Sequence, residues 1–181
     1  MRALLLALVL AAATPALAEA PPEPERYRGP PYAAPVPETL AGATVVDNAA
    51  AAALHAAGTA VFIDVMPRDV KPADLPEGTI WRDKPRDSIP GSIWLPNTGF
   101  EALSPAEEAY LRAGLDHATG GNLNRPILIF CRAECWMSWN VAKRALGYGY
   151  TQVIWYPDGP EGWLTLPQNP PLQRLEPFVA E

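Results

Sequence analysis

The sequence predicts an α/β fold with a mainly parallel central sheet and helices on both faces. Short apolar runs rich in branched residues, at residues 60–65, 127–130 and 153–156, alternate with stretches of helical spacing. Runs that are apolar throughout are typical of strands buried on both faces. Strands that alternate with helices are joined by crossover connections, and such connections build a parallel sheet covered on both sides.

The first elements follow one another from residue 44 onward. Residues 44–46 form a short expected strand, and Asp47 can cap the alanine-rich helix that Gly58 ends. Residues 60–65 form the second strand. The polar, proline-containing residues 66–88 then predict a long irregular excursion, and a loop of this length is often functional.

The middle of the chain contributes a turn, a third strand and a second helix. The turn and the strand lie within residues 89–96. Ser104, Pro105 and Glu107 predict a helix start, because they supply a hydroxyl cap, a proline at the first helical position and a glutamate three residues after the cap. We expect this helix to run to about His117.

Both cysteines of the chain, Cys131 and Cys135, lie between a strand at residues 127–130 and a segment of helical spacing at residues 136–146. Backbone N–H groups converge where a strand gives way to a helix, and the helix dipole adds partial positive charge. Such surroundings lower the pKa of a thiol, which makes Cys131 the expected nucleophile. The strand of residues 153–156 and a turn at residues 157–159 follow.

Residues 1–18 have the pattern of a signal peptide. Arg2 precedes an apolar core, and the small residues Ala16 and Ala18 form a cleavage site. We therefore expect export to a bacterial periplasm, with no attachment to a membrane after cleavage.

The remainder divides into an arm, a single domain and a tail. Residues 19–39 are rich in proline and favour an extended arm, which Tyr27 and Tyr32 could anchor on the domain. The domain spans residues 40–163, and residues 164–181 form a tail that we expect to pack on the surface. The chain has a net charge of −6 and no basic run, which disfavours nucleic acid and anionic lipid as partners.

Three segments make residues 40–163 resemble the rhodanese-like domain. Residues 62–65, F-I-D-V, are similar to the strand of that family that ends in aspartate. Residues 88–96, S-I-P-G-S-I-W-L-P, are similar to its H-I-P-G-A-x-x-I-P segment. Residues 127–163 resemble its strand, cysteine loop, helix, second strand and terminal G-W. The resemblance implies a cysteine that carries a persulfide, and that role falls on Cys131.

The signal peptide, the C-x-x-x-C-W-M-S-W-N segment and the Y-P-D-G-x-x-G-W segment also resemble a narrower group, the exported PQQ-dependent catabolism-associated CXXCW motif proteins. This chain departs from the group's name by having three residues between its cysteines. The resemblance implies a periplasmic quinoprotein alcohol dehydrogenase, or its cytochrome, as the partner. The partner would hold the PQQ, and we expect no cofactor in this chain besides a cysteine persulfide or disulfide.

The resemblance assigns the binding of substrate to the loop that begins after Cys131. Its expected residues are Arg132, Ala133, Glu134 and Trp136, with Asp64 and Met137 behind them. The family has a basic residue where this chain has Trp136, and Glu134 adds a negative charge that Arg132 offsets in part. We therefore expect weak transfer of sulfur from thiosulfate, since the loop opposes an anionic donor. For Asp64 we expect a hydrogen bond to a neighbouring loop.

Three functions stay open for the cysteine pair. As an enzyme, the chain is a sulfurtransferase or a thiol–disulfide oxidoreductase in which Cys135 resolves Cys131, provided that their Cα atoms lie within about 7 Å. As a binding or assembly module, it holds the pair as a fixed disulfide. As an accessory protein it binds Cu(I), because two thiolates suit that ion and the spacing resembles the thiol pair of thioredoxin-like copper chaperones. We expect no metal, since no histidine lies near the pair in the sequence.

Overall fold

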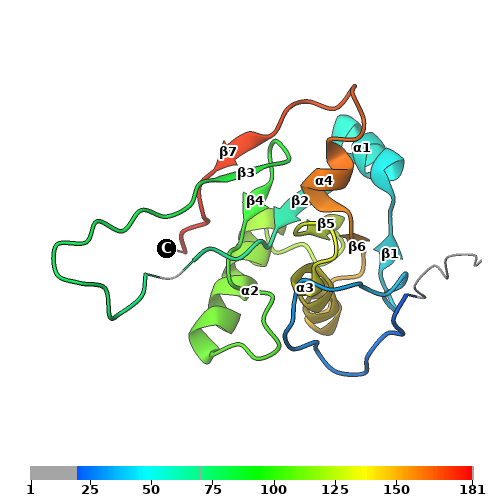
Figure 1. Ribbon diagram of the computed structural model, residues 1–181. Coiled ribbons are helices and arrows are strands. Elements are labelled where there is room, and N and C mark those ends of the chain that lie inside the picture. The colour runs from blue at the N-terminus through cyan, green and yellow to red at the C-terminus, as the bar shows by residue number, and fades with distance from the viewer. Residues whose placement is uncertain (1–19, 70, 181) are drawn as a thin grey trace, which may run out of the picture.

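A computed structural model of the chain describes residues 20–69 and 71–180; the expected signal peptide, residues 1–18, lies outside them. A five-stranded sheet forms the centre, with the strands in the order β1-β6-β5-β2-β4, and every neighbouring pair is parallel (Figure 1). The strands are β1 (Thr44–Val45), β2 (Val61–Asp64), β4 (Ile93–Trp94), β5 (Ile127–Phe130) and β6 (Val153–Tyr156).

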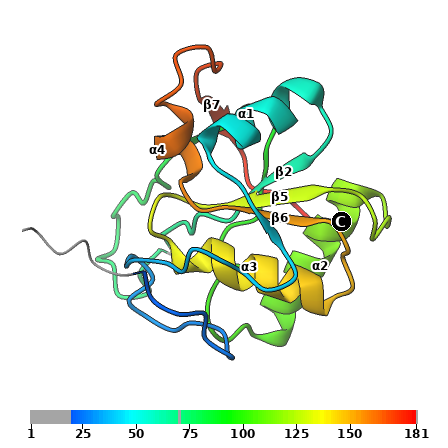
Figure 2. The same ribbon diagram turned by 90° about the vertical axis from the view of Figure 1, so that its right-hand side faces the viewer.

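Helices cover both faces of this sheet (Figure 2). Helices α1 (Asn48–Ala57) and α4 (Gly159–Trp163) lie on one face, and α2 (Pro105–Thr119) and α3 (Trp136–Gly147) lie on the other. The predicted fold class, an α/β fold with a mainly parallel sheet between two layers of helices, is therefore confirmed. No helix within residues 20–69 and 71–180 combines the length and the hydropathy that a bilayer crossing requires.

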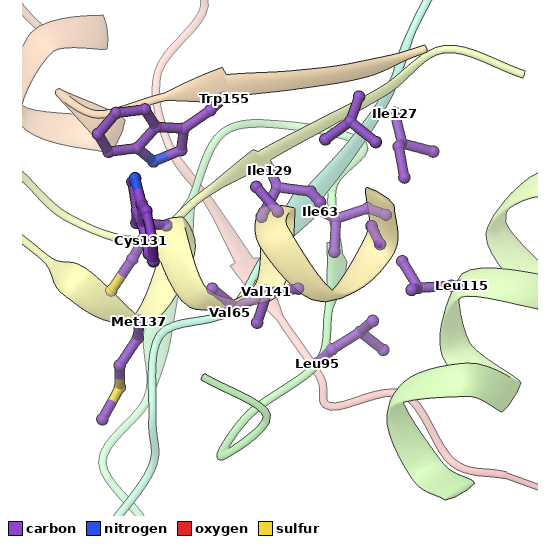
Figure 3. Close-up of a cluster of buried hydrophobic side chains, with 14 of the residues drawn as sticks. Ile63, Val65, Leu95, Leu115, Ile127, Ile129, Cys131, Met137, Val141 and Trp155 are labelled. Atoms are coloured by element: carbon purple, nitrogen blue, oxygen red, sulfur yellow. The ribbon is translucent and has the colours of Figure 1, made fainter. Parts of the chain in front are cut away.

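Successive residues of the central strands point into two different cores, which explains why the strands are apolar throughout. On β5, Ile127 and Ile129 join the core beneath α2 and α3, whereas Leu128 and Phe130 join the core beneath α1 and α4. Strand β6 divides in the same way, with Trp155 buried in the first core, which Figure 3 shows.

The helix starts follow the capping signals of the sequence. The Asp47 side chain accepts a hydrogen bond from the Ala50 N–H, and Gly58 ends α1 in the left-handed conformation with a φ of 63°. Ser104 and Glu107 form the complete capping box that begins α2. These bonds satisfy N–H groups that have no partner inside the helix.

Three elements differ from the sequence prediction. The excursion contains β3 (Arg86–Ser88), the tail contains β7 (Gln173–Leu175), and the two pair as an antiparallel ribbon. The segment expected to be only a turn leads into the five-residue helix α4. Both strands are short and polar, and each pairs with a segment that is distant in the sequence. No apolar pattern therefore predicts them. Helix α4 contains two glycines and a proline, which are poor helix formers.

The proline-rich arm is ordered and lies along α3 (Figure 2). The Asn140 side chain accepts a hydrogen bond from the Arg28 N–H at 2.8 Å and donates one to the Arg28 carbonyl at 2.9 Å. The Arg144 guanidinium stacks on the Tyr27 ring, 3.9 Å from its centroid. Tyr27 therefore anchors the arm, as its sequence position suggested.

Candidate functional site

The cysteines lie at the carboxyl edge of the sheet, where β2 and β5 end side by side. Asp64 is the last residue of β2 and pairs in register with Phe130, the residue before Cys131. Helix α3 begins at Trp136, so Cys135 is its N-cap residue, and Cys131 stands one short loop earlier. Because the two sulfurs are bonded to each other, the partial positive charge of the helix end acts on both cysteines, whereas the sequence argument had considered it for Cys131 alone.

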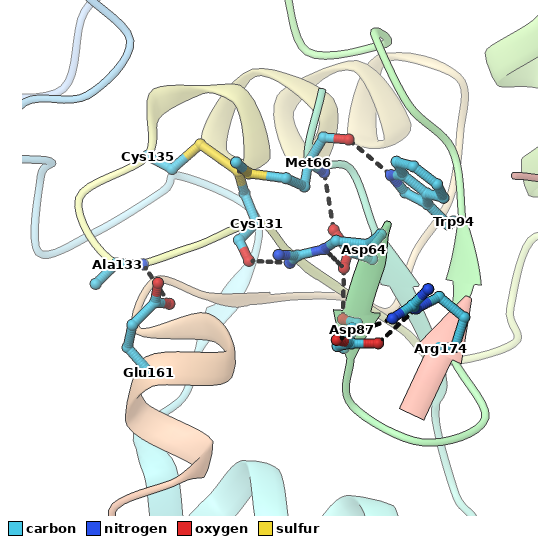
Figure 4. Close-up of polar contacts among 11 residues, drawn as sticks. Asp64, Met66, Asp87, Trp94, Cys131, Ala133, Cys135, Glu161 and Arg174 are labelled. Atoms are coloured by element: carbon cyan, nitrogen blue, oxygen red, sulfur yellow. Dashed lines mark hydrogen bonds and ion pairs between the residues drawn. A yellow bond between two sulfur atoms is a disulfide. The ribbon is translucent and has the colours of Figure 1, made fainter. Parts of the chain in front are cut away.

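The structure joins Cys131 to Cys135 in a disulfide, with Cα atoms 6.2 Å apart (Figure 4). This separation meets the condition for a resolving pair. Both residues are buried: Cys131 is 0% exposed and Cys135 is 4% exposed. A large partner reaches either sulfur only after local movement of the segments around them.

Met66 brings a third sulfur to the pair. Its Sδ lies 3.6 Å from the Cys131 Sγ. The backbone of Met66 is held on two sides, because its N–H donates to Asp64 at 2.8 Å and its carbonyl accepts from the Trp94 indole at 2.7 Å. The first residue of the excursion therefore packs against the cysteines.

Asp64 is a buried carboxylate that organises this edge of the sheet (Figure 4). It accepts hydrogen bonds from the Arg86 Nε at 2.7 Å, from the Ser88 hydroxyl and from the Met66 N–H. Burial raises the pKa of Asp64, and the Arg86 guanidinium opposes that effect. Arg86 also donates to the Cys131 carbonyl at 3.2 Å, so Asp64 supports the cysteine loop through Arg86.

A carboxylate of the protein already occupies one N–H group of the cysteine loop. The Ala133 N–H donates to the Glu161 Oε2 at 3.2 Å (Figure 4). Helix α4, which carries Glu161, approaches closely because its first residue is glycine: a Cβ on Gly159 would lie 2.8 Å from the Cys131 carbonyl oxygen. Glu134 has a φ of 52°, a left-handed conformation in the same loop. One N–H group of the loop is thus already bonded to a negative group of the protein.

The arm covers the other side of the loop. The Ala34 N–H donates to the Glu134 carbonyl at 3.1 Å, and the Trp136 N–H donates to the Tyr32 carbonyl at 2.9 Å. Ala33 and Cys135 form an isolated antiparallel β-bridge. The N–H group of Trp136, a residue of the expected substrate loop, is therefore bonded to the arm.

The remaining residues of the expected substrate loop divide into exposed and buried groups. Arg132 and Glu134 are exposed. Trp136 is 3% exposed and packs edge to face with Trp139 at 5.6 Å, so its ring belongs to the core. Met137 belongs to the same buried cluster as the cysteines (Figure 3).

Sequence reasoning missed Met66, Arg86 and Glu161 as neighbours of the cysteines. Met66 follows closely on the end of β2, at the edge where open parallel sheets keep their sites, so its position was a usable signal. Arg86 lies in the long excursion and Glu161 lies in the short helix α4. No sequence pattern predicts that these two segments bring their side chains to the cysteine loop.

The next two features are a possible metal site and a groove that lies away from the cysteines. Residues 20–69 and 71–180 contain no group of three or more histidine, cysteine, aspartate or glutamate residues that could hold a metal. An apolar groove of about 560 Å³ lies between α1 and the β1–β6 edge, lined by residues that include Val46, Leu54 and Ile154. Neither cysteine lines this groove.

No protein-family model matches the chain, and no curated protein matches it. Among solved structures, the chain is similar to SseA from Escherichia coli, described as a 3-mercaptopyruvate sulfotransferase with the rhodanese fold, at 18% sequence identity and a TM-score of 0.37. The match covers 70% of this chain and 44% of SseA, so the chain spans less than half the length of that protein.

Proposed function

We propose that the chain is an exported rhodanese-like protein that performs thiol chemistry through a reversible Cys131–Cys135 pair. The observation that carries the proposal is the pairing itself: the two cysteines lie at disulfide distance at the carboxyl edge of a parallel sheet. Open α/β sheets hold their ligands at this edge. The order of the rhodanese-like segments in the sequence supports the same assignment.

Thiol–disulfide exchange is the form of this chemistry that the loop favours. The Cys131 thiolate attacks one sulfur of a partner disulfide and displaces the other as a thiolate. The Cys135 thiolate then attacks the Cys131 sulfur of the mixed disulfide and releases the second partner thiolate. The Cys131–Cys135 disulfide forms, two electrons pass to the partner, and the two protons of the original thiols go to the partner thiolates or to water.

Sulfur transfer from thiosulfate fits the loop less well. The Glu161 carboxylate lies against the Ala133 N–H, where an anionic donor would need a hydrogen bond. The exposed Glu134 adds a second negative charge to the same loop. Two unit charges repel by about 4 kcal/mol at 4 Å near a protein surface, so this arrangement disfavours a dianion.

A second function, a non-catalytic binding or assembly module with a fixed disulfide, is favoured by two observations. Both cysteines are buried, and the arm is bonded directly to the loop between them. A bond that no partner reaches would serve only the structure.

The cellular setting of the proposal comes from the sequence. Residues 1–18 supply the export signal. The resemblance to the CXXCW motif proteins supplies a periplasmic quinoprotein alcohol dehydrogenase, or its cytochrome, as the partner.

A glutathione redox titration of the folded protein, followed by mass spectrometry of the alkylated thiols, tests the proposal. We expect the pair to be reduced and reoxidised reversibly while the domain stays folded. A Cys135→Ser variant should then trap the partner as a mixed disulfide on Cys131, and the wild-type chain, in which Cys135 resolves that bond, should trap none. A bridge that resists strongly reducing buffer in the folded protein would favour the module instead.

A further inference from the structure

The sulfur atoms of the chain are unevenly distributed. Besides Met1, the sequence contains two methionines and two cysteines, and all four belong to or pack on one buried cluster. The Met66 Sδ is 3.6 Å from the Cys131 Sγ, and Cys131 is in turn joined to Cys135. Three sulfurs from β2's end, β5's end and the start of α3 thus converge on one point (Figure 4).

We propose that the reduced pair, Cys131 and Cys135, binds Cu(I) together with the thioether of Met66. The proposal goes beyond thiol exchange and rests on the proposed function in one respect, which is that the disulfide can be reduced. A dithiol reductant supplies the two electrons and two protons that convert the disulfide into two thiols. Binding of Cu(I) then releases both protons as the thiolates form bonds to the metal.

The geometry suits three sulfur ligands on one ion. With bonds of about 2.3 Å, the length that thiolates make to zinc, three sulfurs in a trigonal arrangement lie about 4 Å from one another. The observed 3.6 Å between Met66 Sδ and Cys131 Sγ is close to that spacing. The Cα separation of 6.2 Å allows the two cysteine sulfurs to part by the small distance that a shared ion needs.

The surroundings favour a soft monovalent ion. Thiolate and thioether sulfur select Cu(I), whereas zinc sites usually have four ligands from cysteine, histidine or carboxylate. No such group of three or more acidic, histidine and cysteine residues is found in the described part of the chain. The side chains of the surrounding core cluster are apolar, and the nearby Arg86 guanidinium is paired with the Asp64 carboxylate, so this ion pair adds no net charge beside the site.

Met66 has a fixed backbone and is the most accessible of the three ligands. Hydrogen bonds from its N–H to Asp64 and from the Trp94 indole to its carbonyl hold its backbone. Its side chain is half-buried, whereas both cysteines are buried. Copper would therefore approach from the side of Met66, where a donor can pass the ion first to a thioether and then to the thiolates.

The test uses the full mature chain, reduced under anaerobic conditions, in competition with a chromogenic Cu(I) chelator. Alkylation and mass spectrometry first establish that the pair is reduced in the folded protein. We expect one Cu(I) per chain. Met66→Leu should weaken binding at least about tenfold, the lower end of what changes around a metal site cost. Cys131→Ser should weaken it further.

Met137→Leu is the matched control, because it removes the other methionine of the same cluster with a change of similar size. It should leave the affinity nearly unchanged, and X-ray absorption of the wild-type complex should show sulfur ligands alone. Equal affinity of Met66→Leu and wild type, or a loss in Met137→Leu instead, would overturn the proposal while leaving thiol exchange intact. A bridge that cannot be reduced in the folded protein would overturn both.

Discussion

At the scale of single residues, one buried carboxylate connects the cysteine loop to the rest of the fold. Asp64 has no exposed surface, and it binds Arg86, Ser88 and the Met66 N–H. Arg86 is bonded in turn to the Cys131 carbonyl. Removing one partner of a buried charge pair costs far more than the pair itself contributes, because the other charge is left without compensation.

Arg86→Ala should therefore destabilise the protein by about 3–5 kcal/mol. The control is Arg174→Ala, which breaks an exposed ion pair with Asp87 in the same ribbon and should cost no more than about 1 kcal/mol. Urea unfolding of both variants measures the difference. Equal losses of stability in the two variants would mean that the Asp64–Arg86 pair does not stabilise the carboxyl edge of the sheet.

Glu161→Gln should raise the rate of sulfur transfer from thiosulfate to cyanide. The amide oxygen can still accept from the Ala133 N–H, so the change removes the charge and keeps the contact. We expect an increase of about tenfold, which corresponds to ~1.4 kcal/mol of relieved repulsion.

The control for this change is Glu176→Gln, at an exposed glutamate that lies outside the cysteine loop. It should leave the rate unchanged. A rate that stays constant in Glu161→Gln would show that charge at the loop does not limit the use of thiosulfate.

At the scale of elements, the predicted parts are those whose signals are local. The capping residues predicted the starts of α1 and α2, and the apolar runs predicted β2, β5 and β6. Strands β3 and β7 escaped prediction because they pair with each other across a sequence distance that no local periodicity reports. The proximity of the two cysteines was predictable because, like the helix caps, it depends on residues close together in the sequence. The positions of Arg86 and Glu161 beside the loop depend instead on long-range packing.

Ser104→Ala should destabilise the protein by about 1 kcal/mol through the start of α2. The bond from the Ser104 N–H to Glu107 lowers the pKa of Glu107, so the contribution of that carboxylate is present at neutral pH. It is lost as the pH falls through the lowered pKa. Thermal unfolding at several pH values checks both the size and the direction, and Ser104→Thr should retain most of the stability.

Tyr32→Ala should loosen the arm and expose the cysteine loop. Its hydroxyl accepts a hydrogen bond from the Glu101 N–H, and its ring packs edge-on against Phe100. Such contacts contribute about 1 kcal/mol each, so the reduced thiols should react with iodoacetamide roughly tenfold faster or more. Arg26→Ala changes an exposed residue of the same arm and should have no effect. Unchanged rates in Tyr32→Ala would contradict the shielding role of the arm.

At the scale of the whole molecule, the disulfide is a minor source of stability. The bridged cysteines are only four residues apart, so the bond removes about 2 kcal/mol of conformational entropy from the unfolded chain. The two buried cores lie on the two faces of the sheet, and the cysteines belong to only one of them.

Reduction should therefore lower the melting temperature by only about 4–8 °C, the shift that such a loss produces in a protein of this size. Calorimetry of the oxidised and reduced forms measures it, and a Cys131→Ser/Cys135→Ser double variant should match the reduced form. Loss of cooperative unfolding on reduction would show instead that the bond is essential to the fold.

The bond between Arg28 and Asn140 spans 112 residues. The ribosome makes the arm before it makes α3, so the surface that binds the arm does not exist until most of the domain has been made and folded. Docking of the arm therefore belongs to the last stages of folding, because contacts so distant in sequence form late. Until then the two thiols are open to any enzyme that introduces or removes disulfides. In the mature protein the docked arm limits access to the pair, so each exchange reaction requires a local opening of these contacts.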